Sequence, residues 1–530
     1  MIIVVSLWAL SLLCLIMRKI GAMAGVNYQS FRNRGADLSG KGFSSPLVKY
    51  YNMNGILEKT NREMSSFWDE RKLSSYMARA TYNYDDRYLL TVNFRVDGAT
   101  QFGDNNKWGY FPSVALAWRI NQEKFFHCDY INSLKLKVGY GKAGNAWVPT
   151  GRTQALIQYM PVYLGGAVEN GVTWYPTDNA YYPNPNLKWE GSNTINVGAE
   201  IYTRHFGFDI NVYRKLSYDL LMDRSRPVET GYSNITLNKG ELENYGIEAK
   251  LEGYFSFGSK LSWTPSLLVA YNRNEIKNFD NDIVWNQSIW DAQKFYGYAG
   301  ANREGYPINS FFVYEYAGVW QQHEAIEAAK YGARPGEAKF ADIATSDSEG
   351  NLISNEPDGK IDDADRKFVG SSNPKFTGSI TNRFSYGDWS LSFMFDGVFG
   401  KKVLNYNRLA LMNPDQLCYG NLSTEALGRW TPDCPNTNIP SFTRPIDTNL
   451  AISTFCIEKG DFVRLRELSL AWNHDFNKGI IKRLGVSLTA TNLFTITKYK
   501  GLNPDVTGID GTYSLYPITR SYTLGLNVSF

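Results

Sequence analysis

The chain has 530 residues, a formal net charge of +3, a mean hydropathy of −0.35 and 15% aromatic residues. No apolar run outside the N-terminus approaches the about 20 residues of a membrane-spanning helix, which excludes a helical membrane protein. The small positive charge is not gathered in a basic cluster, and nucleic-acid binding is therefore not expected.

The first twenty residues differ from the rest of the chain. Residues 2–17 are almost continuously apolar and are followed by Arg18 and Lys19. Ala22-Met23-Ala24 resembles a signal-peptidase site, but a signal peptide carries its positive charges before the apolar run. A signal peptide, an uncleaved anchor and a start foreign to the rest of the chain all stay open. We therefore separate an apolar segment of doubtful origin at 1–20 from one β-domain at 21–530.

From about residue 21 the sequence alternates between apolar and polar residues with a period of two, which is typical of strands with one apolar face. Residues 76–83 and 88–97 alternate on both sides of Tyr84-Asp85-Asp86 and predict a hairpin. Further strands are expected at 113–120, 134–140, 195–201, 206–212, 247–252, 389–396, 486–491 and 516–530. In the last of these the apolar positions are Tyr522, Leu524, Leu526, Val528 and Phe530.

About fourteen such strands are expected, with short turns alternating with long loops. A soluble sandwich also has strands with one apolar face, so alternation alone does not decide between it and a barrel. The sequence shows no helical period and no second buried face, and its loops are too long for a compact soluble domain. These loops are expected at 98–108, 141–190, 274–307, 321–373 and 400–460. The pattern favours an all-β, transmembrane antiparallel β-barrel.

The polar face of the strands would line the lumen, where charges can guide a solute or pair with one another. The candidate lumen charges are Arg79, Arg95, Asp97, Arg119, Lys135, Lys137, Glu200, Glu248, Lys250 and Glu252. In the loops, the candidate ligand-binding residues are Trp174, Tyr175, Trp285 and Trp290, because flat aromatic faces suit sugar rings. An interfacial girdle or packing within the loops is the alternative role for such rings.

An acidic loop segment resembles the second half of an EF-hand calcium loop. Glu356, Asp358, Asp362 and Asp365 are the candidate Ca²⁺ ligands, since calcium prefers oxygen ligands at such a spacing. The alternative is a solvated turn ordered by its Asp side chains. No other cofactor is expected, and without a recognisable catalytic set of residues the chain is not expected to be an enzyme.

A series of short motifs, in the same order, resembles the SusC/RagA family of TonB-linked outer-membrane proteins. They include Arg95-Val-Asp-Gly-Ala-Thr-Gln-Phe-Gly, Asn186-Leu-Lys-Trp-Glu, Asp358-Gly-Lys-Ile-Asp and Phe462-Val-Arg-Leu-Arg. The resemblance covers about residues 21–530 and implies the C-terminal part of a barrel of about 22 strands. Members of that family are about twice as long and carry a TonB box and a plug domain before the barrel.

By this resemblance, the intact protein would import oligosaccharides, peptides or other large nutrients across the outer membrane of a Gram-negative bacterium. TonB would act on the plug, and a SusD-like surface lipoprotein would form a lid. Without a plug and a TonB box, the chain is not expected to perform energised uptake alone. A passive outer-membrane porin, a soluble secreted carbohydrate-binding β-protein and a fragment that is never inserted are the alternatives.

Overall fold

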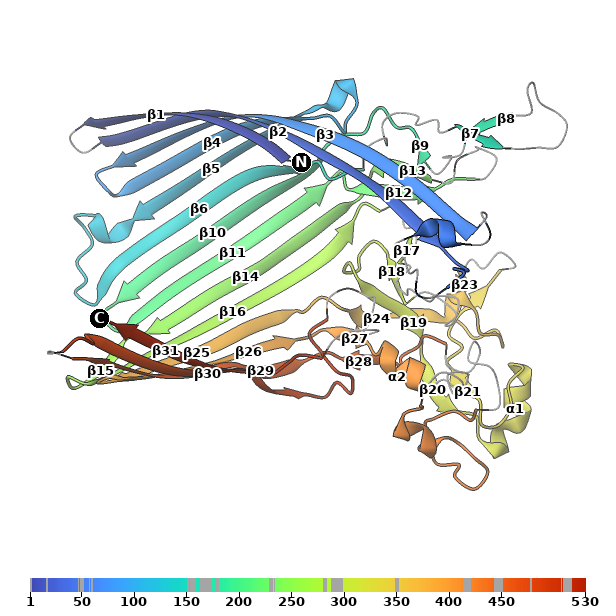
Figure 1. Ribbon diagram of the computed structural model, residues 1–530. Coiled ribbons are helices and arrows are strands. Elements are labelled where there is room, and N and C mark those ends of the chain that lie inside the picture. Colours follow the sequence, from blue (N-terminus) through green and yellow to red (C-terminus); the bar gives the residue numbers. More distant parts are fainter. Residues whose placement is uncertain are drawn as a thin grey trace. The chain divides into compact units, whose positions relative to one another are not determined.

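The computed structural model consists mainly of long β-strands (Figure 1). It describes residues 2–530 except 16–17, 46, 48–51, 57, 59–60, 150–151, 153–158, 163–172, 177–180, 228–231, 233, 280–283, 287–298, 348–351, 413–420, 443–450, 477–478, 507 and 509–516. The chain divides into two units. The first comprises Met1–Phe126, Leu136–Val197 and Lys215–Glu241, and the second comprises His127–Lys135, Gly198–Arg214 and Leu242–Phe530.

In the first unit, consecutive strands pair antiparallel from the start of the chain. They are β1 (Ile2–Leu15), β2 (Arg18–Gly40), β3 (Arg62–Tyr84), β4 (Tyr88–Ala99) and β5 (Trp108–Arg119). The apolar run at the N-terminus is thus strand β1. None of the described helices is long and apolar enough to cross a membrane.

The hairpin predicted around residues 84–86 is confirmed between β3 and β4. Asp85 and Asp86 have φ values of 54° and 50°, the left-handed conformation that a tight hairpin turn requires. The Asn83 side-chain oxygen accepts the Asp86 backbone N–H at 3.0 Å and holds this turn. Short polar side chains tolerate this conformation better than most others, which explains the Asp-Asp pair at this position.

The second unit also contains a series of antiparallel pairs. These strands are β16 (Leu261–Lys277), β25 (Phe376–Tyr386), β26 (Trp389–Phe399), β29 (Phe462–Asp475), β30 (Arg483–Thr497) and β31 (Ser521–Ser529), with the short β15 (Phe255–Phe257) beside β16. The other long strands are β6 (Ile131–Asn145), β10 (Glu190–Thr203), β11 (Phe206–Tyr218) and β14 (Glu241–Gly253). Within each unit the order of the paired long strands follows the chain. The predicted all-β antiparallel fold is confirmed.

Short elements lie in the segments between the long strands. They are β7 (Tyr159–Val162), β8 (Thr173–Pro176), β9 (Tyr181–Tyr182), β12 (Leu221–Ser225), β13 (Asn234–Asn238), β17 (Val284–Asn286), β18 (Gly300–Asn302), β19 (Ser310–Tyr314), β20 (Tyr316–Val319), α1 (Ala325–Lys330), β21 (Ala338–Phe340), β22 (Thr345–Ser346), β23 (Leu352–Ser354), β24 (Arg366–Ser371), β27 (Lys402–Leu404), α2 (Tyr406–Leu411) and β28 (Ile457–Lys459). The segments expected only as long loops thus contain short strands and helices.

The loops of the second unit fold around their own apolar core, which we call the loop core. Its buried residues are Ala299, Phe311, Val313, Leu404, Tyr406, Leu409, Met412, Ala426, Ile452, Phe455, Cys456 and Ile457. The predictions of no helix and no second buried face were wrong here. Each of the two α-helices in the described part of the chain has six residues, too few to establish a helical period in the sequence.

A smaller apolar core lies in the first unit and involves two of the motifs that carry the family resemblance. Phe102 and Leu187 are almost fully buried there with Ala99 and Val148. The ring of Phe102 packs against Trp189, with 5.2 Å between the centroids. The Gln-Phe-Gly and Leu-Lys-Trp-Glu motifs therefore fix the segments that follow β4 and precede β10.

Candidate functional site

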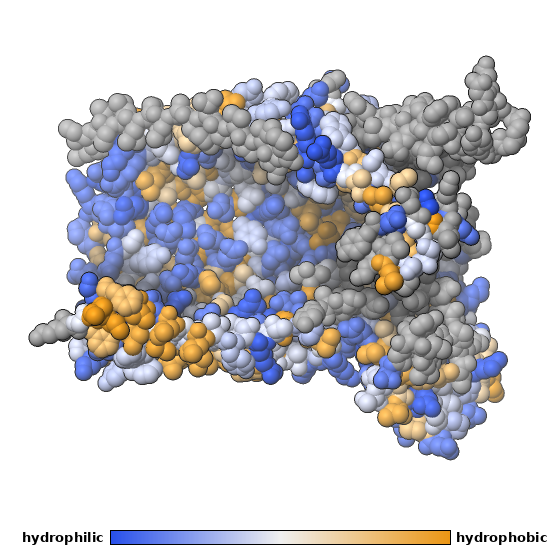
Figure 2. Space-filling view, in the orientation of Figure 1, coloured by the Kyte–Doolittle hydropathy of each residue, from blue (hydrophilic) through white to orange (hydrophobic). Residues whose placement is uncertain are grey.

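The apolar positions of the long strands remain exposed in the described part of the chain. They include Val92, Phe94, Leu116, Val138, Ile195, Val197, Val212, Ile380, Leu488 and Leu524. Figure 2 shows hydrophobic side chains gathered over β31 and its neighbours. Water-soluble surfaces rarely expose so many large apolar side chains, whereas the outer band of a membrane β-sheet does. This face is therefore suited to lipid.

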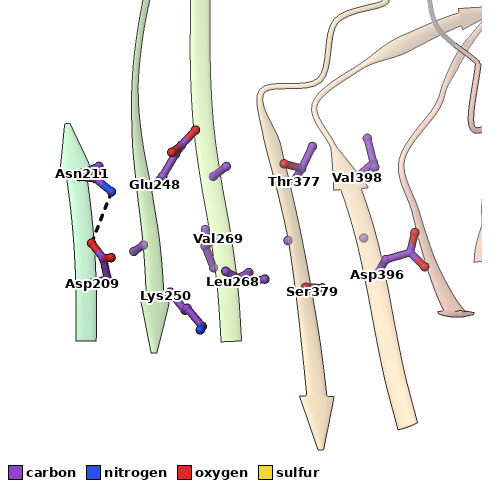
Figure 3. A pocket seen from close by; sticks show the side chains of 14 residues that line it. Asp209, Asn211, Glu248, Lys250, Leu268, Val269, Thr377, Ser379, Asp396 and Val398 are labelled. Carbon is purple, nitrogen blue, oxygen red and sulfur yellow. Dashed lines mark hydrogen bonds between the residues drawn. The ribbon is translucent and has the colours of Figure 1, made fainter. Parts of the chain in front are cut away.

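The opposite face of the strands is polar, and one part of it forms a pocket of about 450 Å³ in the second unit. Its polar side chains come from alternate positions of their strands, as the period of two requires (Figure 3). Asp209 and Asn211 come from β11, Glu248 and Lys250 from β14, and Asp396 from β26. The Asn211 amide donates to Asp209 at 3.4 Å. A wall of carboxylates, amides and ammonium groups can contact a hydrated solute along this face.

Several of the predicted lumen charges pair with one another. Arg95 contacts Asp97 at 2.7 Å, and Lys250 contacts Glu252 at 2.7 Å, each pair spaced by two residues on one strand face. Lys135 contacts Glu200 of β10 at 3.5 Å. The sequence left two roles open for these charges, guiding a solute and pairing with one another. These contacts support pairing.

A second pocket, of about 760 Å³, lies in the second unit at the end of β16 that precedes the loop core. We call it the basic pocket. Its lining includes the cationic residues Arg273, Lys375, Lys401, Lys402 and Lys459 and the carboxylate of Asp461. Sequence reasoning missed this site. The run Gly400-Lys401-Lys402 directly after β26 was its signal, but Lys459 lies far from it in the sequence.

The candidate calcium ligands lie in a turn whose carboxylates accept backbone N–H groups. Asp365 is buried; its Oδ1 accepts from Ile343 and Ala344 at 2.8 and 3.1 Å, and its Oδ2 accepts from Asp362 at 2.9 Å. Burial raises the pKa of Asp365, while these hydrogen bonds oppose the shift.

The other candidate ligands are arranged in the same way or point to solvent. Asp362 accepts from the backbone N–H of Ala364 at 2.9 Å, and Asp358 accepts from Lys360 at 2.9 Å. Glu356 is exposed. Within the described ranges, no three His, Cys, Asp or Glu side chains are grouped where they could hold a metal ion. These contacts support the ordered-turn alternative, and calcium binding stays a prediction.

The candidate aromatic ligand residues are located only in part. Trp174 and Tyr175 lie in β8, which pairs antiparallel with β7, and Trp285 lies in β17. Their side chains, and all of Trp290, lie outside the part of the chain that the structure describes. Their role in ligand binding stays a prediction.

Comparison with known proteins identifies the family. A family model for the TonB dependent receptor-like β-barrel matches residues 8–493. The chain belongs to this family. The resemblance to TonB-linked outer-membrane proteins drawn from the short motifs is thereby confirmed.

Two curated relatives match almost the whole chain. TonB-dependent receptor P3 of Formosa agariphila is 29% identical over 532 residues, which cover 96% of this chain and 50% of that protein. TonB-dependent receptor SusC of Bacteroides thetaiotaomicron is 27% identical over 553 residues, which cover 96% of this chain and 48% of that protein. This TonB-dependent receptor chain thus spans about half the length of the curated relatives that it matches. They are named as receptors rather than enzymes.

Solved structures show the same fold. The RagAB peptide transporter superposes with a TM-score of 0.80 at 24% identity, covering 99% of this chain and 55% of that chain. The "open-open" state of the RagAB peptide importer gives a TM-score of 0.81 at 22% identity, with 99% and 54% covered.

Proposed function

We propose that this chain forms the C-terminal part of the barrel wall and the loop core of a SusC-type TonB-dependent transporter. The transporter lies in the outer membrane of a Gram-negative bacterium and imports oligosaccharides or other large nutrients. The observation that carries this proposal is the two-faced sheet. Exposed apolar side chains cover one face, and the other face carries the polar pocket with Asp209, Glu248 and Asp396.

The proposed import depends on TonB acting on a plug domain and on a SusD-like lipoprotein above the loops. The folded loops support such a partner, because a buried core gives a binding surface a fixed shape. Ile326 of α1 and Leu427 are 84% and 80% exposed on these loops. An apolar group on a rigid surface is a suitable anchor for a protein partner.

Uptake in the source bacterium tests this function. The gene of the whole transporter that includes this chain is deleted and then restored as the wild type or with Val92→Arg, which places a charge on the apolar face. We expect the deletion to abolish uptake of a fluorescent oligosaccharide or peptide, and the wild-type gene to restore it only when TonB is present. Uptake that continues without TonB would support a passive porin instead. Recovery of the chain in aqueous buffer without detergent would overturn the proposal.

A further inference from the structure

The basic pocket contains two lysines that face each other. Lys402 of β27 and Lys459 of β28 are register partners in the antiparallel pair. Side chains that are directly opposite in such a pair lie on the same face, and like charges there are destabilising. Among the residues that the structure describes, neither ammonium group has an ion-pair partner. The fold therefore bears an unfavourable charge pair at a pocket wall, which an anion would relieve.

Glycines make room for the lysine stems of this pocket. A Cβ at Gly370, where φ is +131°, would lie 2.9 Å from Cγ of Lys402. A Cβ at Gly460 would lie 2.9 Å from Cε of Lys401. The backbone is thus shaped to let two basic side chains pack closely beside it. This close approach indicates a built site rather than a chance collection of surface lysines.

Among the lining residues Asp461 is the one carboxylate against five cationic side chains, so it offsets only part of the positive charge of the pocket. Asp461 accepts the backbone N–H of Gly400 at 2.7 Å and so serves the turn after β26. Lys401 is only 3% exposed, and its ammonium donates to the carbonyl of Val506 at 3.0 Å. A buried ammonium next to unpaired lysines creates a positive potential that an anionic ligand can neutralise.

The remaining lining of the pocket suits sugar rings. Tyr306 stacks on Phe368 with 3.8 Å between the ring centroids, yet remains 37% exposed. Tyr271 and the amides of Asn272 and Asn373 also line the pocket. Aromatic faces stack on the apolar faces of sugars, and amides bind their hydroxyl groups. Rings and amides next to cations therefore favour an acidic sugar over a simple inorganic anion.

We propose that the basic pocket binds the carboxylate or sulfate groups of an acidic oligosaccharide and thereby selects anionic solutes. This inference rests on the transport function proposed above and names its substrate class. Lys402 and Lys459 would contact the acid group, and Tyr306 would contact the sugar ring.

Calorimetric titration of the purified full chain in detergent tests the proposal. The ligands are an oligogalacturonate, a neutral glucose oligomer of the same length and an oligoglutamate peptide. We expect the oligogalacturonate to bind most tightly and to lose affinity as salt rises from about 0.05 to 0.5 M. Lys402→Gln and Lys459→Gln should each weaken binding roughly tenfold, as expected for loss of one charged contact. Lys260→Gln, at an exposed turn before β16, is the charge-matched control and should leave the affinity unchanged.

The same variants give a second measurement that does not require ligand. Lys402→Gln should raise the thermal midpoint of the ligand-free chain, because it removes the repulsion from Lys459. Lys260→Gln should not raise the thermal midpoint. If Lys402 only stabilised the fold, its replacement would lower the thermal midpoint instead. A lower midpoint for Lys402→Gln would therefore contradict the proposal.

The remaining outcomes separate this inference from the proposed function. Equal affinity for the neutral oligomer, or unchanged oligogalacturonate affinity in Lys402→Gln, would overturn the anion site while TonB-dependent uptake could still stand. Tighter binding of oligoglutamate than of oligogalacturonate would identify the ligand class as an acidic peptide rather than an acidic oligosaccharide. Absence of binding by all three ligands would overturn the site. Uptake that does not depend on TonB would overturn the proposed TonB-dependent transport, whatever ligand the lysines bind.

Discussion

Arg464 of β29 and Asp505 form an ion pair at 3.2 Å in which the guanidinium is fully buried and the carboxylate is 40% exposed. The Arg464 Nε also donates to Oγ1 of Thr495 at 3.2 Å. No described residue accepts a hydrogen bond from the second terminal nitrogen, Nη2. The free energy of burying this charge therefore depends strongly on each of its few partners.

Removal of the Asp505 carboxylate should therefore destabilise the second unit. We expect Asp505→Ala to lower the free energy of unfolding by about 3 kcal/mol, because it leaves a buried cation without its counter-charge. Asp505→Asn, which keeps an acceptor oxygen, should cost less. Urea unfolding in detergent micelles measures both. The control is Asp433→Ala at an exposed carboxylate, and equal effects of Asp505→Ala and Asp433→Ala would refute the prediction.

The loop core predicts different effects for two leucines of α2. Leu409 is fully buried, whereas Leu411 is 46% exposed. Leu409→Ala should lower the free energy of unfolding by about 2–5 kcal/mol, because it removes buried apolar surface and leaves a cavity. Leu411→Ala should change it by no more than about 0.5 kcal/mol. Limited proteolysis with mass spectrometry measures the difference as faster cleavage within 400–460 in Leu409→Ala only. Equal cleavage rates in the two variants would mean that the loop core does not hold these loops.

The two faces of β4 predict opposite tolerance to charge. Val92 is 41% exposed on the apolar face, and Thr91 is its neighbour on the polar face. Val92→Arg should disfavour membrane insertion by about 2–4 kcal/mol, as expected for Arg near the bilayer midplane. Thr91→Arg carries the same charge toward water and should insert normally. The yield of chain in urea-washed outer membranes measures insertion, and equal yields from the two variants would count against a lipid-facing Val92.

Burial lowers the pKa of Lys401 below its ordinary value of 10.5, and this gives stability a pH dependence. Between the lowered pKa and 10.5 the unfolded chain binds more protons than the folded chain, so stability rises with pH there. We expect the thermal midpoint of the wild type to rise relative to Lys401→Met as the pH increases from about 8 to 10. A constant difference between the two midpoints over this range would contradict a lowered pKa.

Asp365 gives a test of the turn and of the calcium prediction together. Asp365→Asn keeps an oxygen for the N–H groups of Ile343 and Ala344 but places its amide N–H₂ against the N–H of Asp362. It should lower the free energy of unfolding by about 1–3 kcal/mol. Asp358→Asn, with one local contact, should cost less. A shift of the wild-type unfolding curve with about 1 mM Ca²⁺, lost in Asp365→Asn, would confirm a calcium site. Curves that coincide with and without a chelator would leave backbone capping as the role of Asp365.

The sequence predicted the long strands because their residues alternate between an apolar face and a polar face. In β26, Trp389, Leu391 and Phe393 alternate with Ser390 and Ser392, and the strand is found from Trp389 to Phe399. Such a pattern is local and can be recognised without knowledge of the partner strand. The same is true of the Asp85-Asp86 turn.

The loop core and the basic pocket could not be predicted in this way, because they depend on contacts between distant segments. Leu404, Ile452 and Phe455 pack together although about fifty residues separate the first from the others. Lys402 and Lys459 become neighbours only through the pairing of β27 with β28. No periodic pattern marks either feature, and the only local signal was two adjacent lysines after a glycine.

The central claim is that one face of the sheet meets lipid and the other meets water. Single cysteines at Val486, Ser487, Leu488 and Thr489 of β30, in a chain whose five native cysteines are replaced by serine, test it most directly. A membrane-impermeant maleimide should label positions 487 and 489 in outer-membrane vesicles made permeable to it, and label 486 and 488 only after detergent extraction. Equal labelling of all four positions in the membrane would contradict the claim.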